Sequence, residues 1–239
     1  EKAIAMFAGL KPAKDFETGS KWAYCNTNYI FIASIIARVS GQPVEEFLAR
    51  NIFEPLKMKD TYVYNVRMPT EPANHVRGLK HVNERIEPND LTVLDGVVGD
   101  GNVYSSVEDL YLWDQGLYKN KIVKAATFAQ ALQPVKLNDG STYPYGFGWF
   151  IDTARAGSYN HTGGWAGFGN IIMRDTKNGR TMICLNSAST GWGNSTARNF
   201  FNGTKIEPAQ LTLITNVVLA DGTGATSRKG AVRVQGRMI

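Results

Sequence analysis

Two short apolar runs on either side of an Asn-Gly dipeptide constrain the fold more than any other feature. Residues 171–175 and 181–186 are rich in apolar and β-branched side chains, and Asn178-Gly179 lies between them. Asn and Gly both tolerate the positive φ that a tight hairpin turn requires. With a further run at residues 146–152, the pattern predicts an antiparallel sheet in the second half of the chain.

The first half of the chain has helical signals. Residues 29–39 are almost wholly apolar, follow the capping oxygens of Asn26 and Thr27, and end at Gly41. This pattern predicts a core helix that is buried on all sides.

Two further helices are expected. One runs from Pro43 to about Phe53, with acidic residues in its first turn. The other spans residues 106–118, where Ser106 and Asp109 resemble a capping box. Between them, residues 60–103 have no sustained period, so we expect a long irregular region with short strands.

Composition excludes several classes of protein. The chain has 239 residues, 43% of them hydrophobic, and a net charge of +5 without a basic cluster. It is therefore globular, and no nucleic-acid partner is expected. No apolar run reaches the roughly 18 residues that span a bilayer. Because the chain opens on Glu1 without a signal peptide, we expect a piece from the middle of a longer product.

The cysteines, and the histidines outside the motifs discussed below, do not suggest a metal or disulfide site. Cys25 and Cys184 match no metal or disulfide spacing, so we expect buried free thiols. His75 and His81 lie in the polar middle region and are expected to face solvent. No metal and no cofactor are expected.

A serine nucleophile cannot be recognised in this chain. No Ser is followed three residues later by Lys, and there is no Gly-x-Ser-x-Gly sequence. Three other segments have the composition of active-site pieces. They are Tyr24-Cys25-Asn26 before the first apolar helix, residues 99–106, and His161-Thr162-Gly163-Gly164 after an expected strand.

In this order the three segments resemble the serine β-lactamase and DD-peptidase superfamily, especially its class C and esterase-like branch. Residues 20–29 and 52–61 look like the middle segment of that family. The resemblance covers about residues 1–203. It implies an α/β (α+β) fold, an antiparallel sheet flanked by helices, which is β-lactamase/transpeptidase-like and incomplete at the N-terminus because the Ser-x-x-Lys segment is missing.

The resemblance also implies roles for these residues. Tyr24 would be a base, which requires cationic neighbours because a phenol titrates near 10. His161 and a Lys on the missing segment would be those neighbours. Asn26 would hold the acyl-amide group of the substrate, and the backbone N–H of Gly164 would donate to the oxyanion. Thr162 and Gly163 would bind substrate. Three alternatives stay open: Tyr24 as a core aromatic, Asn26 as a helix cap, and His161 as a surface histidine.

Two departures from the family pattern affect the expected substrate. His161 stands where typical β-lactamases have Lys, which favours esterase, amidase or D-amino-acid peptidase activity over antibiotic hydrolysis. Cys25 stands where the family often has Ser. Its side chain is expected to be buried and to have only a secondary role in the site.

The end of the chain has a second resemblance. Residues 211–220 and 231–234, joined through Asp221-Gly222, predict a β-hairpin. Residues 213–234 look like the opening strands of N-acyl-D-amino-acid deacylases, which are metal-dependent amidohydrolases, but the His-x-His metal motif is absent. We therefore expect two parts, a hydrolase domain at 1–203 and a linker with a hairpin at 204–239.

The leading expectation is a serine hydrolase that acts on amide or ester bonds of a small molecule or peptide through an acyl-enzyme. This chain alone should be inactive, with a missing N-terminal segment of the same parent as its partner. The resemblance suggests a periplasmic or secreted protein. The alternatives are a non-catalytic binding module for peptidoglycan-like or D-amino-acid ligands, and a leader segment for an amidohydrolase.

Overall fold

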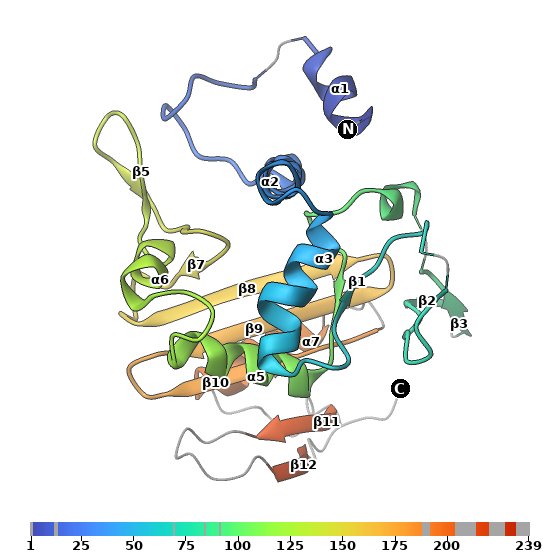
Figure 1. Ribbon diagram of the computed structural model, residues 1–239. Helices are drawn as coiled ribbons and strands as arrows, with labels where there is room; N and C mark the ends of the chain where they lie inside the picture. The colour runs from blue at the N-terminus through green and yellow to red at the C-terminus, as the bar shows by residue number, and fades with distance from the viewer. Residues whose placement is uncertain are drawn as a thin grey trace.

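The computed structural model describes residues 2–11, 14–68, 70–83, 85–90, 92–187, 192–203, 214–219 and 228–232. The central element is a four-stranded antiparallel sheet with the strand order β10-β9-β8-β7. Its strands are β7 (Phe150–Ile151), β8 (Ser158–Trp165), β9 (Phe168–Asp175) and β10 (Arg180–Cys184). This sheet confirms the predicted fold class (Figure 1).

The hairpin between β9 and β10 differs from the predicted tight turn. Asp175 pairs directly with Arg180, so four residues form the loop, and only Gly179 of the Asn-Gly pair has a positive φ. The Asp175 carboxylate accepts hydrogen bonds from the backbone N–H and side-chain amide of Asn178. Those bonds stabilise the longer loop, which explains why the dipeptide rule failed here.

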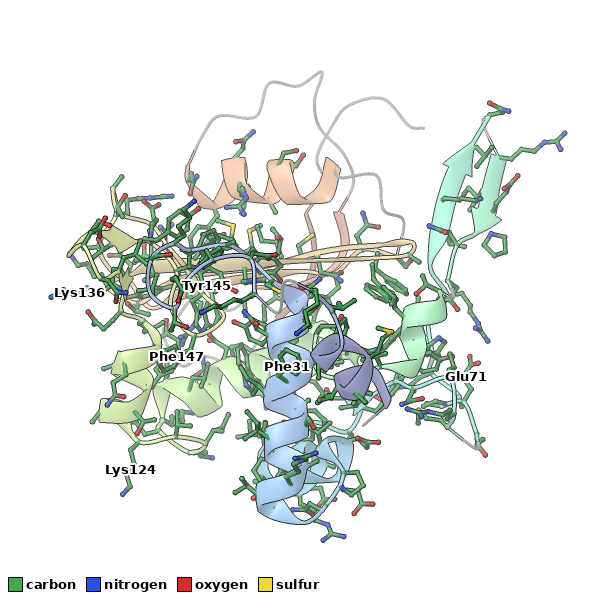
Figure 2. The ribbon with its side chains drawn as sticks, turned by 90° about the horizontal axis from the view of Figure 1, so that it is seen from above. Phe31, Glu71, Lys124, Lys136, Tyr145 and Phe147 are labelled. Carbon is green, nitrogen blue, oxygen red and sulfur yellow. The ribbon has the colours of Figure 1, made fainter. Side chains whose placement is uncertain are left out.

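Helices cover both faces of the sheet. Figure 2 shows α7 (Trp192–Phe201) across one face, with α2 (Asn26–Ser40) and α5 (Val107–Tyr118) on the other. Under α7, Ile171 and Met173 of β9 form a buried cluster with Ala197 and Phe201. A second cluster, beside α5, contains Phe53, Leu56, Met58 and Val63.

The prediction that α2 is buried on all sides is wrong. Only Ala33 is buried on this helix, while Ile32 and Ile35 are exposed and Val39 is 84% exposed. Gly99 approaches the helix on the side of Ala33, and the ring of Phe31 meets Phe7 on a different side. The described residues leave the side with Ile32, Ile35 and Val39 exposed. The predicted stop at Gly41 is confirmed, with φ of 71°.

The second predicted helix is present but composite. It consists of α3 (Val44–Leu48), a π-helical turn η1 (Ala49–Phe53) and α4 (Glu54–Leu56). Pro55 lacks a backbone N–H and cannot bond the carbonyl four residues earlier, which fits a change of helical pitch just before it.

Helix α5 confirms the third prediction and half of its cap. The Ser106 hydroxyl accepts from the Asp109 N–H at 3.1 Å. The Asp109 carboxylate does not bond back to Ser106 but accepts from the Asp60 N–H and the Thr61 hydroxyl, both at 2.7 Å. It therefore ties α5 to the chain that follows α4.

Short elements make up the rest of the described chain. The irregular region contains η2 (Val93–Gly96, a 3-10 turn) and two strand pairs, β1 (Tyr62–Val63) with β4 (Val103–Tyr104) and β2 (Leu79–Val82) with β3 (Arg85–Pro88). The others are α1 (Lys2–Ala8), α6 (Ala125–Ala131), β5 (Val135–Lys136), β6 (Thr142–Tyr143), β11 (Ile214–Leu219) and β12 (Arg228–Val232). Strand β7 covers only two residues of the predicted run at 146–152.

Strands β11 and β12 pair antiparallel, as the predicted hairpin requires. The expected strand ends at 211–213, 220 and 233–234, and the linking turn, lie outside the described residues. Within the residues that the structure describes, no helix is long and apolar enough to cross a membrane.

Candidate active site

His161 lies inside β8, not after a strand as the sequence suggested. It pairs with Ile172 of β9, and the register continues through Gly164, which pairs with Gly169. The side chain is half-buried, and its Nδ1 lies 2.6 Å from the carbonyl oxygen of Thr162. The sheet therefore fixes both the position of this histidine and one of its hydrogen bonds.

Tyr24 lies beside His161. The extended chain before α2 brings the Tyr24 ring to 5.9 Å from the His161 ring, centroid to centroid, at an angle of 36°. Tyr24 is 47% exposed, so the alternative that it is a core aromatic is wrong. A tyrosine ring and an imidazole thus lie side by side where β8 carries its glycines.

Asn26 is the first residue of α2, at the same helix end as Tyr24, and it is exposed. The helix-cap interpretation is wrong, because Cys25 occupies the N-cap position and no side chain caps the helix. The Asn26 amide is not used by the helix terminus.

The glycines of β8 border open space. Strand β7 pairs with β8 only at Tyr159 and Asn160, so within the described part of the chain residues 161–165 have a strand on one side only. Thr162, Gly163 and Gly164 are exposed, and a Cβ on Gly164 would meet nothing within 4 Å. Packing therefore does not require glycine at 164, and the strand is accessible to another extended chain.

Tyr145 is a site residue that the sequence reasoning missed. Its hydroxyl lies 3.0 Å from His161 Nε2 and 3.4 Å from the hydroxyl of Tyr29 on α2. Figure 2 labels Tyr145 beside the sheet, which that view shows edge-on. No motif marked this tyrosine, because its contact with His161 arises only when the β6–β7 loop folds over β8.

An aromatic cluster surrounds these side chains. Trp22 stacks on Tyr143 with ring centroids 3.8 Å apart, and Tyr145 contacts Phe150 edge to face at 4.8 Å. Phe150 in turn stacks on His161 at 5.3 Å. The cluster removes water from one side of the imidazole.

The environment shifts the pKa values of the two central groups in opposite directions. Burial, with Tyr29 and Asp100 adding to it, raises the pKa of the Tyr24 phenol. Burial lowers the pKa of His161, although the bond to the Thr162 carbonyl opposes this shift. Both directions are opposite to those that a His161 cation stabilising a Tyr24 phenolate requires.

His75 contradicts the prediction of a solvent-facing histidine. Its side chain is 1% exposed and stacks on the ring of Tyr104. Its Nδ1 shares a hydrogen bond of 2.8 Å with the Tyr62 hydroxyl. The reason is that the chain after Glu71 folds back over β1 and β4. The side chain of His81, on β2, lies outside the described residues.

The irregular region supports the turn between β8 and β9. The Trp165 indole N–H donates to the buried Asp95 carboxylate at 2.8 Å. The backbones of Gly78 and Gly167 touch, and a Cβ on either glycine would overlap backbone atoms. This region is therefore a structural support for the end of β8.

The two cysteines are free, as predicted, but both are half-buried rather than buried. Burial raises the pKa of the Cys184 thiol. The Cys184 thiol therefore lacks the lowered pKa of a reactive cysteine.

The relatives of this chain among known proteins include penicillin-binding proteins and D-aminopeptidases. The chain is 35% identical to penicillin-binding protein 4* of Bacillus subtilis over 184 residues, which are 72% of this chain and 41% of that protein. It is 28% identical to a D-aminopeptidase of Brucella canis over 139 residues, 56% of this chain and 25% of the relative. The chain thus spans less than half of the length of either relative.

The fold has a counterpart among solved structures. The octameric penicillin-binding protein homologue of Pyrococcus abyssi matches with a TM-score of 0.71 at 21% identity, over 92% of this chain and 56% of that one. The family model named Beta-lactamase matches residues 1–200. The chain therefore belongs to the beta-lactamase family, with penicillin-binding proteins and D-aminopeptidases among its relatives.

Proposed function

We propose that this chain is part of a serine hydrolase that cleaves amide or ester bonds through an acyl-enzyme, with the nucleophile supplied from outside residues 1–239. The observation that carries the proposal is the meeting of Tyr24 and His161 beside the open stretch of β8. Family membership and the D-aminopeptidase relative support it.

The proposed chemistry assigns one proton transfer to Tyr24. As a phenolate, Tyr24 takes the hydroxyl proton of the serine while the serine oxygen attacks the substrate carbonyl. It then returns that proton to the leaving amine or alcohol, and a water repeats the sequence to release the acid. The N–H of Gly164 would donate to the oxyanion, and Asn26, Thr162 and Gly163 would hold the substrate.

Activation of Tyr24 requires a cation from beyond this chain. The pKa of Tyr24 is raised and that of His161 is lowered, so at neutral pH the pair is a neutral phenol beside a neutral imidazole. The lysine that the family resemblance implies on the missing segment would reverse the shift at Tyr24. This requirement explains why we expect the isolated chain to be inactive.

The substrate class that we propose is amides and short peptides of D-amino acids. His161, in place of lysine, offers no fixed positive charge for the carboxylate of a β-lactam antibiotic. The D-aminopeptidase relative supports the same class.

The test uses the full-length product and a panel of D- and L-amino-acid amides, esters and a β-lactam. We expect turnover of the D-amides, and Tyr24→Phe should lower kcat/KM by about 10² to 10⁴-fold because it removes the general base. Tyr143→Phe is the matched control, since Tyr143 stacks on Trp22 without contacting His161. Full activity in the Tyr24→Phe variant would refute the assigned role.

A non-catalytic binding module for peptidoglycan-like or D-amino-acid ligands is the second candidate, because the exposed Asn26 and the open stretch of β8 could hold such a ligand without a nucleophile. In that case the full-length product would bind D-amino-acid amides without turnover. Calorimetry beside the activity assay distinguishes the two functions.

A further inference from the structure

We propose that Tyr145 is a positioning residue whose hydroxyl holds His161 in its neutral form, with the proton on Nδ1. Its importance for catalysis rests on the proposed function above, but the hydrogen bonds themselves do not. Two tyrosine hydroxyls and an imidazole form a hydrogen-bonded row, from Tyr29 through Tyr145 to His161.

The proton on His161 can be assigned from its partners. Nδ1 lies 2.6 Å from the Thr162 carbonyl oxygen, which can only accept, so Nδ1 must carry the proton. In the neutral ring Nε2 is then an acceptor. The Tyr145 hydroxyl, 3.0 Å away, is the donor that it meets.

Tyr145 is held firmly enough to be a reliable donor. It is buried, its carbonyl accepts from the Val135 N–H at 3.0 Å, and its backbone bridges to Phe150. Its ring lies edge-on to Tyr24 at 6.1 Å. Burial is the main cause that raises its pKa, so the phenol keeps its proton at every pH near neutral.

Tyr29 completes the row from α2. Its hydroxyl lies 3.4 Å from that of Tyr145, so Tyr29 donates to Tyr145 when Tyr145 donates to His161. If His161 became charged, Nε2 would donate to Tyr145, and Tyr145 would have to turn its proton to Tyr29. The hydrogen bond between the two tyrosines therefore exists with either charge on His161, and Tyr29 orients the Tyr145 hydroxyl in both states.

The groups that face His161 from the surrounding elements fit this assignment. They are Tyr24 from the chain before α2, Tyr145 from the β6–β7 loop and Phe150 from β7. None of these three carries a positive or negative charge near neutral pH. His161 would thus pack against Tyr24 as a neutral imidazole and not act as a cation, with both ring nitrogens bonded, to Thr162 and Tyr145.

The experiment is NMR of the imidazole nitrogens of the full-length product across a pH titration, with His161 identified by its loss in His161→Gln. We expect one tautomer in the wild type, protonated on Nδ1. In Tyr145→Phe the bond to the Thr162 carbonyl should keep the proton on Nδ1. Nε2 loses its donor, so the titration midpoint of His161 should rise. In Tyr29→Phe the midpoint should shift less than in Tyr145→Phe, because the bond between the two tyrosines is present in both charge states.

Tyr143→Phe is the control, since it removes a neighbouring hydroxyl that has no contact with His161, and it should change neither quantity. Backbone amide spectra show whether each variant is folded. An unchanged or lowered midpoint in Tyr145→Phe, or a shift in Tyr29→Phe as large as that in Tyr145→Phe, overturns the proposal. These readouts do not depend on turnover, so they can fail while the proposed hydrolase function holds, and the reverse is also true.

Discussion

Arg174 and Asp114 form an ion pair in which both side chains are fully buried, with 2.6 Å between Nε and Oδ1. Arg174 comes from the C-terminal end of β9 and Asp114 from α5, so the pair joins the sheet to the helix. Thr181 of β10 donates to the other carboxylate oxygen at 3.0 Å. The guanidinium also lies over the ring of Tyr118, 4.4 Å from its centroid.

Removal of Asp114 should therefore destabilise the chain strongly. Asp114→Ala leaves the Arg174 charge buried without a partner, and the expected loss in free energy of unfolding is about 3 to 5 kcal/mol. Glu46→Ala is the control, because Glu46 pairs with Arg50 on the surface, and its expected cost is about 0.5 kcal/mol or less. Urea titrations of both variants measure the difference, and equal losses would contradict the buried-pair account.

The contact between Gly78 and Gly167 gives a second prediction. Gly167 and Gly179 both have positive φ, at 74° and 63°, but a Cβ would meet backbone 2.4 Å away at Gly167 and nothing within 4 Å at Gly179. Gly179→Ala should cost roughly 1 to 2 kcal/mol for its backbone conformation. Gly167→Ala should cost clearly more, since the backbone of the irregular region must also move.

Thermal unfolding of these two alanine variants is the measurement. If they lost equal stability, the irregular region would not be in contact with the β8–β9 turn.

The lowered pKa of His161 predicts a pH dependence of stability. The folded chain binds this proton less readily than the unfolded chain, whose histidine titrates near 6.5. The contribution of His161 is therefore fully present above about pH 6.5 and is lost as the pH falls through the lower folded value. His161→Gln should flatten this part of the profile.

Urea titrations of wild type and His161→Gln between about pH 7.5 and pH 5.5 isolate the contribution from those of other groups. A wild-type stability that increased as the pH fell, relative to the variant, would mean that the folded protein favours the charged imidazole.

Local signals in the sequence were sufficient for the main elements. The stop at Gly41, the Ser106 cap and the strands on either side of Asn178-Gly179 depend on neighbouring residues, and each was found. The convergence of Tyr24 and His161 was expected from the family resemblance, since 137 positions separate them (161 − 24).

Features that depend on tertiary packing were not predicted. The apolar character of residues 29–39 did not reveal that the described chain leaves one side of this helix exposed. The burial of His75 depends on Tyr62 and Tyr104, which reach it from two short paired strands. Tyr145 was missed for the same reason, because a hydrogen bond across folded elements leaves no periodic pattern.

The edge strand β10 predicts the behaviour of the isolated chain in solution. In the described part of the chain β10 hydrogen-bonds to β9 alone, and residues 182–185 are apolar. Strand β11 lies near β10 without pairing with it, so the prediction holds unless this hairpin covers the edge. An open apolar edge favours pairing with another chain, so we expect concentration-dependent association in sedimentation velocity. A monomer with slowly exchanging amides across 181–186, and no segment paired there, would show that the chain is a self-sufficient domain and that the fragment interpretation is wrong.

Mapping of the acylated serine tests the central claim most directly. The isolated chain and the full-length product are each incubated with a fluorophosphonate and a β-lactam, and the adducts are located by mass spectrometry. The account predicts no stoichiometric adduct on any serine of residues 1–239, and one adduct on a serine outside them, followed three residues later by lysine, in the full-length product. A stoichiometric adduct on a serine within residues 1–239 would contradict it, because the nucleophile would then belong to this chain.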